Sequence, residues 1–354
     1  MNIIKAGYEI MPEPMGPLGL CKKIELVART CYKSEDLITE DSCIRMIGSL
    51  ISREHYAMLE HASLVFEVDS SSFNDTLGLV THLEKSLIKN HELETFKSYL
   101  RFTDDNQRFI ISGNIRAWIE FLQMCVKCIN KIPLFFKAYL DLNTKNDKTD
   151  ASILFKDFID IPAGMFVFPE SNNYISIQIK DCSKLSLRER LIHQDLSVKF
   201  IVDRGVTHEL VRHRDCSFAQ ESTRYCNYSK GKFGEEIAVI EPCFFNPDSV
   251  ATITKYSMWQ VASEDAEETY FDLVKAGATP QEARDVLPTS VKADIILTTN
   301  IREWIHILEL RALGTTGKPH PQMSEVMVPL AKEFVNGLLS DFTCIDSVNK
   351  MLSL

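Results

Sequence analysis

Hydrophobic residues recur at helical spacing in several stretches of the chain. Over residues 44–51 they repeat every three or four positions behind a candidate cap at Asp41, which predicts an amphipathic helix. A longer helix is predicted over residues 258–275 and ends at Gly277. Over residues 62–68 apolar and polar side chains alternate instead, which predicts a half-buried strand.

Two capping signals begin further helices toward the C-terminus. Thr279 is followed by proline and then by a glutamate at the third position, which predicts a helix with Arg284 in its first turns. Asn300 is also followed by a glutamate three residues later. The helix that begins there places Arg311 on the same stripe as its apolar residues, so this arginine is expected to face the core.

The middle of the chain has a less regular pattern. A helix is predicted near residues 79–89, a turn at residues 112–114 with a helix beyond it, and a polar surface loop at residues 143–150. No internal repeat or low-complexity tract interrupts the sequence. The pattern therefore indicates one domain with an internal elaboration.

The composition limits the classes of function. With 354 residues, 45% of them hydrophobic, the chain can form one large core or two modest domains. Its formal net charge of -10 gives no global attraction to nucleic acid or to an anionic membrane, so an anionic ligand must bind at a local cationic site. No apolar run approaches the roughly 18 residues of a membrane span, and we expect neither a signal peptide nor an anchor.

The ten cysteines are scattered without the dense spacing of a disulfide scaffold, which favours a reducing cytoplasm. Cys125 and Cys128 form a CxxC pair within an apolar stretch. Because no second CxxC or nearby histidine pair completes a tetrahedral set, we expect buried thiols here rather than a metal or redox site. The prediction for the chain is that it binds no metal.

The strongest candidate chemistry lies in residues 204–228, where arginine is the only permanent cation. A guanidinium offers a planar fork of donors that pairs with phosphate or with the oxygens of a pyrimidine, whereas lysine supplies a compact charge. Ser222 and Gln220 add a hydroxyl and an amide that would complete such a cradle. Its centre is formed by Arg212, His213, Arg214, Ser222 and Arg224.

Other interpretations of these residues remain open at this point. The arginines could form surface salt bridges with the nearby acids Asp203, Glu209, Asp215 and Glu221. Arg311 could interact with its helix dipole or extend out of the apolar stripe, and His55 and His61 could be hydrogen-bonded structural residues. Ser222 lies in ESTRY rather than in a GxSxG elbow, which argues against a hydrolase, and no Gly-rich loop predicts a P-loop.

One motif resembles the signature of the flavin-dependent thymidylate synthases, also called thymidylate synthase complementing proteins. It consists of Arg212, His213 and Arg214, followed after seven further residues by Ser222. Further stretches match this family in the same order: ARTCY at residues 28–32, HYAMLEHASLVFEV at 55–68, and ARDVLP with NIREWIHILELR between 283 and 311. The resemblance covers residues 1–68 and 198–335. It implies a single synthase domain over residues 1–354 with an insertion at about 69–197.

The resemblance also implies a fold and a reaction. The fold is α/β (α+β), with a central, mostly antiparallel twisted sheet flanked by helices. The protein is expected to be a cytoplasmic homotetramer with active sites shared between subunits, binding small-molecule substrates and neither nucleic acid nor membrane. The implied reaction is the reductive methylation of dUMP to dTMP, with FAD as cofactor and with NADPH and 5,10-methylenetetrahydrofolate as co-substrates.

The family's functional residues map onto this sequence by position. Arg311 matches an arginine that contacts the uracil ring and favours ionisation at N3, and with Ser222 it is the implied catalytic residue. The implied dUMP-binding residues are Glu209, Arg212, Gln220, Glu221, Ser222, Thr223, Arg224, Arg284 and Arg311. The implied FAD-binding residues are His55, Ala57, Arg212, His213, Arg214, Gln220, Asn300, Arg302, His306 and His320.

Some of these positions depart from the family pattern. Ala57 replaces a small hydroxyl residue, so one flavin hydrogen bond is not expected here. Gln220 stands where many members have glutamate, and Glu209 stands where others have glutamine. His320 follows a lengthened connection at residues 314–318. Charge at the nucleotide pocket is therefore expected to be redistributed.

Three other functions compete with the synthase. A related flavin-dependent pyrimidine nucleotide alkylase that transfers hydroxymethyl rather than methyl would use the same residues. A regulatory protein would keep nucleotide and flavin binding without nicotinamide oxidation, and the intact set of signature residues argues against it. An RNA-binding role is disfavoured because the net charge is -10 and no aromatic residues interleave a basic stripe.

Overall fold

The computed structural model describes residues 1–14, 16–70, 100–104, 108–120, 164–167, 174–179, 181–226, 228–229 and 236–354. The chain forms two compact units. The first unit comprises Met1–Pro12, Leu26–Ile38 and Leu196–Leu354, and the second comprises Glu13–Glu25 and Thr39–Asp195. The elements predicted at residues 79–89 and 143–150, and the pair Cys125 and Cys128, lie outside the described residues.

A sheet in the order β2-β8-β11-β9 forms the centre of the first unit. Its strands are β2 (Gly7–Ile10), β8 (Asp195–Asp203), β11 (Lys292–Asn300) and β9 (Ser217–Gln220). β2 pairs antiparallel with β8, and β9 pairs antiparallel with β11. Every residue of β11 between its two ends is buried, as expected for a strand covered on both faces. The same unit contains a parallel pair, β1 (Asn2–Ile4) with β10 (Ala238–Ile240).

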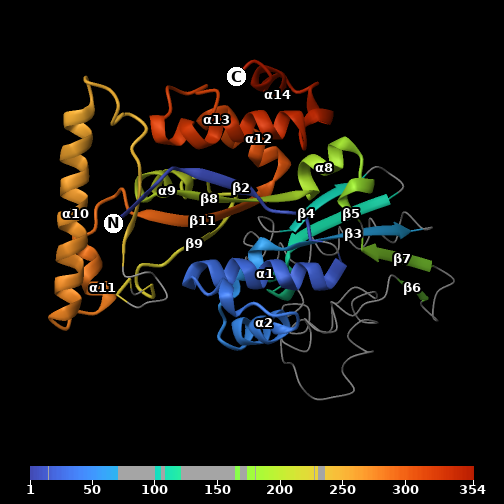
Figure 1. The fold of residues 1–354 in the computed structure, drawn as a ribbon. Helices are drawn as coiled ribbons and strands as arrows, with labels where there is room; N and C mark the ends of the chain where they lie inside the picture. Colours follow the sequence, from blue (N-terminus) through green and yellow to red (C-terminus); the bar gives the residue numbers. More distant parts are fainter. Residues whose placement is uncertain are drawn as a thin grey trace, which may run out of the picture. The chain divides into compact units, whose positions relative to one another are not determined.

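Helices α12 (Ile301–Arg311) and α13 (Pro321–Asn336) pack together along one side of this sheet (Figure 1). Trp304 anchors α12 because its fully buried indole donates Nε1–H to the carbonyl of Leu196 at 3.1 Å. Its ring packs edge-on against Phe334, with the ring centroids 5.4 Å apart. Other helices of this unit are α9 (Arg204–Leu210), α10 (Ile253–Lys275), α11 (Pro280–Ala283) and α14 (Asp346–Met351).

The capping signals near the C-terminus are confirmed. Thr279 and Glu282 form a capping box at α11, although this helix is short and continues as a 3-10 turn over Arg284–Val286. Asn300 caps α12 by accepting a hydrogen bond from the N–H of Glu303 at 2.8 Å. α10 begins earlier than predicted and ends before Gly277, whose φ of +100° closes the helix in the left-handed region.

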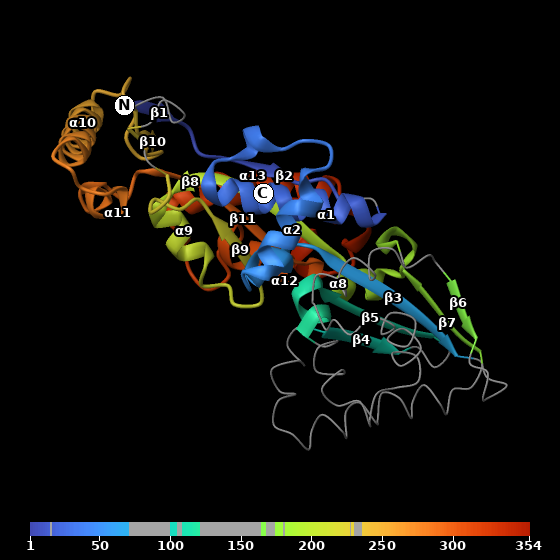
Figure 2. The ribbon, with the colours of Figure 1, turned by 90° about the horizontal axis from the view of Figure 1, so that it is seen from below.

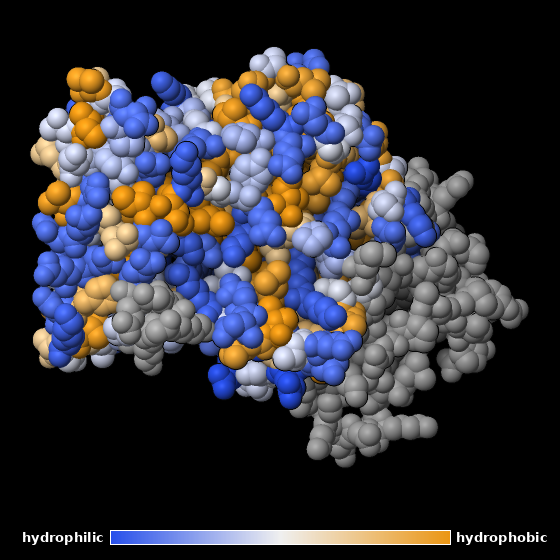
Figure 3. All heavy atoms as spheres, in the orientation of Figure 1, coloured by the Kyte–Doolittle hydropathy of each residue, from blue (hydrophilic) through white to orange (hydrophobic). Residues whose placement is uncertain are grey.

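Helix α10 carries apolar side chains on its exposed surface as well as on its buried one. Met258 and Val261 are 69% and 55% exposed, whereas Tyr270 is fully buried and packs edge-on against Tyr228. Figure 3 shows hydrophobic residues interspersed with hydrophilic ones on the face it presents. Scattered exposed apolar side chains of this kind are ordinary on protein surfaces.

The second unit contains an antiparallel sheet in the order β4-β5-β3-β7-β6 (Figure 2). Its strands are β3 (Ser63–Ser70), β4 (Leu100–Asp104), β5 (Arg108–Asn114), β6 (Gly164–Val167) and β7 (Tyr174–Ile179). Helices α2 (Ser42–Ser52) and α8 (Leu187–His193) belong to this unit. Helix α1 (Gly16–Tyr32) contributes its first part to the second unit and its last part to the first.

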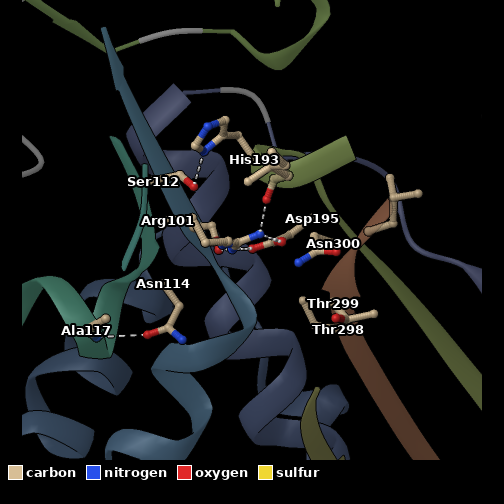
Figure 4. Close-up of polar contacts among 12 residues, drawn as sticks. Arg101, Ser112, Asn114, Ala117, His193, Asp195, Thr298, Thr299 and Asn300 are labelled. Atoms are coloured by element: carbon tan, nitrogen blue, oxygen red, sulfur yellow. Dashed lines mark hydrogen bonds and ion pairs between the residues drawn. The ribbon is translucent and has the colours of Figure 1, made fainter. Parts of the chain in front are cut away.

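Buried polar contacts hold α8 and the sheet of the second unit together. Arg101 on β4 pairs bidentately with Asp195, with both N···O distances at 2.6 Å, and also donates to the carbonyl of Ile192 (Figure 4). His193 Nδ1 lies 2.7 Å from the hydroxyl of Ser112. Burial and, after it, the charge of Arg101 lower the pKa of His193 to about 4, so this imidazole is neutral at neutral pH.

The structure confirms two of the sequence predictions in the second unit and corrects a third. The predicted helix is α2, which directly follows Asp41, and the predicted strand is β3, although Val65 is buried as well as its apolar neighbours. The turn predicted at residues 112–114 is wrong, because these residues complete β5 and pair with β3. Gly113 lies within the strand, paired with Leu64 of β3. The hydroxyl of Ser112 is hydrogen-bonded to His193.

Helices and antiparallel sheets together confirm a mixed α/β fold class. Within the described ranges, no helix is long and apolar enough to cross a membrane. No cluster of His, Cys, Asp and Glu in that part of the chain is arranged to hold a metal ion.

Candidate functional site

Two strand-to-helix junctions of the first unit position the candidate site. β8 leads into α9, which Asp203 caps by accepting an N–H of the first turn at 2.8 Å, and β11 leads into α12. Ser197 faces Thr298 across the two strands, while the N–H of Arg204 bonds to the carbonyl of Thr289, so β8 and β11 run in opposite directions. The two helices therefore leave the sheet from opposite ends, and their C-terminal residues meet.

Arg311, the last residue of α12, lies against the end of α9. Its Nη1 pairs with Oε2 of Glu209 at 3.0 Å, its Nε donates to Nε2 of His213 at 3.2 Å, and its Nη2 donates to the carbonyl of Glu209 at 3.5 Å. Its side chain is 21% exposed, so Arg311 lies at the edge of the core with partners for its charge. Among the described residues these bonds leave one N–H on each terminal nitrogen for a ligand, because a guanidinium has five.

His213 completes this cluster as a neutral imidazole. The side chain is 7% exposed. Burial and, after it, the charges of Arg311 and His306 lower its pKa from 6.5 to about 4. Because Nε2 accepts the Nε–H of Arg311, the proton of the neutral ring is on Nδ1.

The predicted nucleotide-binding residues after β9 form a turn. The N–H of Ser222 bonds to the carbonyl of Cys31 at 3.1 Å, and its Oγ accepts the N–H of Arg224 at 3.3 Å. The hydroxyl of Thr223 accepts a hydrogen bond from Nη1 of Arg284 at 3.5 Å. Arg224 and Arg284 are both exposed, so the turn presents two guanidinium groups beside two hydroxyls. This combination can bind a phosphate.

Three of the four acids that could have neutralised the arginine cluster have other partners. Asp203 caps α9, Glu209 pairs with Arg311, and Glu221 bonds to lysines. Arg212 and Arg214 are exposed, and in the described part of the chain none of these three acids pairs with them. The surface salt-bridge interpretation therefore fails for these acids. Gln220 links β9 to α9, since its Nε2 donates to the hydroxyl of Thr207 at 3.1 Å.

The predicted flavin residues are distributed over both units. In the first unit, Arg302 and His306 are exposed on α12. His320 is exposed at the N-cap of α13, and its ring centroid lies 6.1 Å from that of Phe244. The amide oxygen of Asn300, on the same junction, is occupied by capping α12. His55 and Ala57 belong to the second unit and are both exposed, at the start of a 3-10 helix over Tyr56–His61.

Sequence reasoning missed two lysines next to the predicted site. Lys33 and Lys292 each place Nζ 3.0 Å from a carboxylate oxygen of Glu221, whose side chain is fully buried. Glu221 therefore points into the first unit. One signal was available: Lys292 and Asp294 are the charged residues of β11 and are two positions apart, so they lie on the same face of the strand.

Residues 177–335 match the family model described as thymidylate synthase complementing protein. A flavin-dependent thymidylate synthase of Thermococcus onnurineus (strain NA1) is 34% identical over 109 residues, covering 31% of this chain and 42% of the relative. Another, of Haloarcula marismortui, is 27% identical over 149 residues, covering 38% of this chain and 60% of the relative. The chain thus spans less than two thirds of the length of these curated relatives.

Among solved structures, the UMP/dUMP methylase PolB from Streptomyces cacaoi bound with 5-Br UMP is similar over 40% of this chain and 69% of its own. The identity is 22% and the TM-score is 0.33.

The chain is a mixed α/β protein in which arginine side chains gather at the ends of α9 and α12 and at the turn after β9. Residues 177–335 thus match the model of the thymidylate synthase complementing protein family, and the relatives named above are flavin-dependent thymidylate synthases, which confirms the resemblance seen in the sequence.

Proposed function

We propose that this chain is a flavin-dependent thymidylate synthase, which converts dUMP to dTMP with FAD as cofactor and with NADPH and 5,10-methylenetetrahydrofolate as co-substrates. The observation that carries the proposal is the half-buried guanidinium of Arg311, which Glu209 and His213 hold where α9 and α12 meet. The family of residues 177–335 supports it. In this proposal the enzyme is a cytoplasmic homotetramer with shared active sites, and residues 1–354 form one synthase domain with an insertion at about 69–197.

Arg311 is the proposed contact to the uracil ring. Its two remaining N–H groups suit the oxygen and the ionised N3 of a pyrimidine. A partly desolvated cation stabilises negative charge on the ring more strongly than it would in bulk water. Ionisation at N3 raises the electron density at C5, which receives the one-carbon unit. Neutral His213 orients Arg311 through Nε without adding a second positive charge.

The turn that follows β9 is the proposed phosphate site. Ser222 offers a hydroxyl, Arg284 donates to the hydroxyl of Thr223, and the exposed Arg224 bonds to the Ser222 hydroxyl through its main-chain N–H. Charge-assisted bonds from arginine to phosphate are about twice as strong as neutral ones. The negative net charge of the protein does not oppose this, because Glu221, the acid that directly precedes the turn, is paired with Lys33 and Lys292.

The residues of the first unit also fit a flavin dinucleotide. Arg212, Arg214 and Arg302 are exposed guanidiniums, which suits a diphosphate. When bound, FAD supplies a two-electron relay between the nicotinamide and the one-carbon unit. The chain's own residues orient the nucleotide, hold the charge of the ring and position the ligands. His55, Ala57, His213, Gln220, Asn300, His306 and His320 complete the proposed flavin set.

The proposed reaction has a definite balance of atoms and electrons. C5 of dUMP loses a proton and gains a methyl group whose carbon comes from the methylene of the folate. The two electrons that reduce this carbon come from NADPH, so the folate leaves as tetrahydrofolate. Release of tetrahydrofolate rather than dihydrofolate is therefore a marker of this reaction.

An anaerobic assay in which each component is omitted in turn tests the proposal. Purified protein is supplied with FAD, NADPH, methylenetetrahydrofolate and dUMP, and dTMP is followed by mass spectrometry. We expect dTMP only when all four are present. Binding of FAD and dUMP without any dTMP would show that the chain is not a synthase and would favour a regulatory protein.

A further inference from the structure

Glu221 is held from several sides inside the first unit. Its Oε1 lies 3.0 Å from Nζ of Lys33 and accepts a hydrogen bond from the hydroxyl of Tyr228 at 3.2 Å. Its Oε2 lies 3.0 Å from Nζ of Lys292 and accepts the N–H of Asp294 at 3.3 Å. The side chain is fully buried. A buried carboxylate with this many partners is fixed in one rotamer, because losing any of them would leave a charge or a donor unpaired.

The main chain of Glu221 is fixed as well. Its N–H donates a hydrogen bond to the carbonyl of Asp294 at 2.8 Å, and its carbonyl accepts a hydrogen bond from Nη2 of Arg204 at 3.2 Å. Lys33 follows α1, Lys292 begins β11 and Arg204 begins α9. One residue therefore ties the end of β9 to three other elements of the unit.

The charges around Glu221 form a network that extends along β11. Nζ of Lys292 also lies 2.6 Å from Oδ1 of Asp294, and Oδ2 of Asp294 lies 3.3 Å from Nζ of Lys199. Burial lowers the pKa of Lys292, but the carboxylates of Glu221 and Asp294 outweigh it and raise the pKa overall. In the described part of the chain, the ammonium groups of Lys33, Lys199 and Lys292 are therefore linked through the carboxylates of Glu221 and Asp294.

The residue that follows this clamp begins the proposed phosphate turn. Ser222 is tied to the carbonyl of Cys31 through its own N–H, and beyond it Arg224 is exposed. The turn is therefore fixed at its start and open at its tip. Because Glu221 itself has no exposed atom in its side chain, any effect it has on a ligand must act through Ser222 and Arg224.

We propose that Glu221, clamped by Lys33 and Lys292, is a positioning residue that holds Ser222 and Arg224 in the arrangement that recognises the nucleotide phosphate. The inference rests on the proposed function, because it takes dUMP as the ligand of this turn. It differs from a direct role of Glu221 in binding dUMP, since the carboxylate faces the interior. It also predicts an effect that is specific to the phosphate of the ligand.

The test compares dUMP with deoxyuridine, which has the same base and sugar but no phosphate. Dissociation constants of both are measured by calorimetry on the flavin-loaded full chain, for the wild type and for Glu221→Gln. The substitution keeps the shape of the side chain and removes its charge. We expect dUMP to bind about tenfold more weakly, as for the loss of a charge-assisted contact, and deoxyuridine to bind unchanged.

Asp294→Asn is the matched control. It removes a carboxylate from Lys292 and Lys199 but leaves the clamp on Glu221. We expect it to leave the ratio of the two dissociation constants unchanged. If Glu221→Gln unfolds the protein so that binding cannot be measured, Lys33→Gln is used instead. Lys33 is 26% exposed, and its substitution removes only one of the two lysine contacts of Glu221. The same change in ratio is then expected, with a smaller size.

The outcomes separate the inference from the proposed function. Equal weakening of dUMP and deoxyuridine would show that Glu221 has only a general structural role, and unchanged binding of dUMP would show that it positions nothing. Either result overturns the inference and leaves the synthase proposal standing if the wild type binds dUMP and makes dTMP. A wild type that binds no dUMP would overturn both.

Discussion

Arg311 donates its Nε–H to Nε2 of His213 over 3.2 Å, and this bond fixes the protonation state of the histidine. An imidazole that accepts a hydrogen bond at Nε2 cannot carry a proton there, so the ring is neutral. The pKa of His213, lowered to about 4 by burial and then by Arg311, agrees with this geometry. The cluster therefore places a single positive charge at the proposed position of the uracil ring, and that charge belongs to Arg311.

Replacement of Arg311 by alanine should abolish dTMP formation while the protein keeps its fold and its flavin. The guanidinium is the proposed stabiliser of the ionised ring, and loss of such a group costs about 100-fold or more in kcat. Steady-state kinetics and the visible absorbance of bound flavin are the measurements. Arg188→Ala is the control, because Arg188 is an exposed arginine of α8 and should leave turnover intact. Unchanged turnover in Arg311→Ala would remove this residue from the mechanism.

Glu209 should tolerate glutamine but not alanine. In the wild type, Nη1 of Arg311 donates a hydrogen bond to Oε2 of Glu209 at 3.0 Å. Glutamine keeps an oxygen that can accept this hydrogen bond, whereas alanine leaves the guanidinium without it. We expect kcat/KM for dUMP to stay within about threefold in Glu209→Gln and to fall about tenfold in Glu209→Ala. Equal losses in the two variants would show that the negative charge, and not the acceptor, is what Arg311 needs.

The stability of the protein should fall in mild acid because of His213. Its pKa is lowered from 6.5 in the unfolded chain to about 4 in the folded state, so between these values the unfolded chain binds more protons. The contribution is complete above about pH 6.5 and is lost as the pH falls toward 4. After allowance for partial solvent access it is on the order of 2 kcal/mol.

Urea unfolding on both sides of this pH window measures the effect. His213→Asn should have a flatter dependence of the unfolding free energy on pH than the wild type. His193, whose pKa is also lowered to about 4, keeps its own contribution in that variant. An identical pH dependence in wild type and His213→Asn would mean that His213 is not buried and neutral in the folded protein.

Local signals in the sequence were sufficient to predict parts of the fold. The caps at Thr279 and Asn300 depend on residues three positions apart, and the helix over residues 44–51 depends on its own spacing. The error at residues 112–114 has the opposite origin. Those residues look like a turn by themselves, but pairing with β3 makes them a strand. Tertiary pairing of this kind cannot be read from a short window.

The candidate site shows the same limit. Arg311 was found from its stripe on one helix, and the arginine cluster from its composition, both of which are local. The clamp on Glu221 was not found, because Lys33 and Lys292 come from distant parts of the chain and meet only in the folded unit. Glu221, which the resemblance implies to be a dUMP-binding residue, has a fully buried side chain, and its burial could not be read from its position beside Ser222.

Arg101 should be essential to the stability of the second unit. Its bidentate pair with Asp195 is largely buried, and replacement by methionine would leave that carboxylate buried without its counter-charge. We expect Arg101→Met to lower the unfolding free energy by about 3–5 kcal/mol. The double variant Arg101→Met with Asp195→Leu should recover much of the loss, since both charges are then removed. Thermal unfolding of the three proteins measures this, and an additive double variant would contradict a buried pair.

The proposed synthase activity is tested most sharply by quantifying the products of one anaerobic reaction of the wild-type chain by mass spectrometry. With FAD, NADPH, methylenetetrahydrofolate and dUMP supplied together, we predict dTMP and tetrahydrofolate in equal amounts, matched by the NADPH consumed. A nucleotide heavier than dTMP by one oxygen would identify a hydroxymethyl transferase instead. NADPH oxidation without any new nucleotide, or no reaction at all, would contradict the assignment of this chain as a thymidylate synthase.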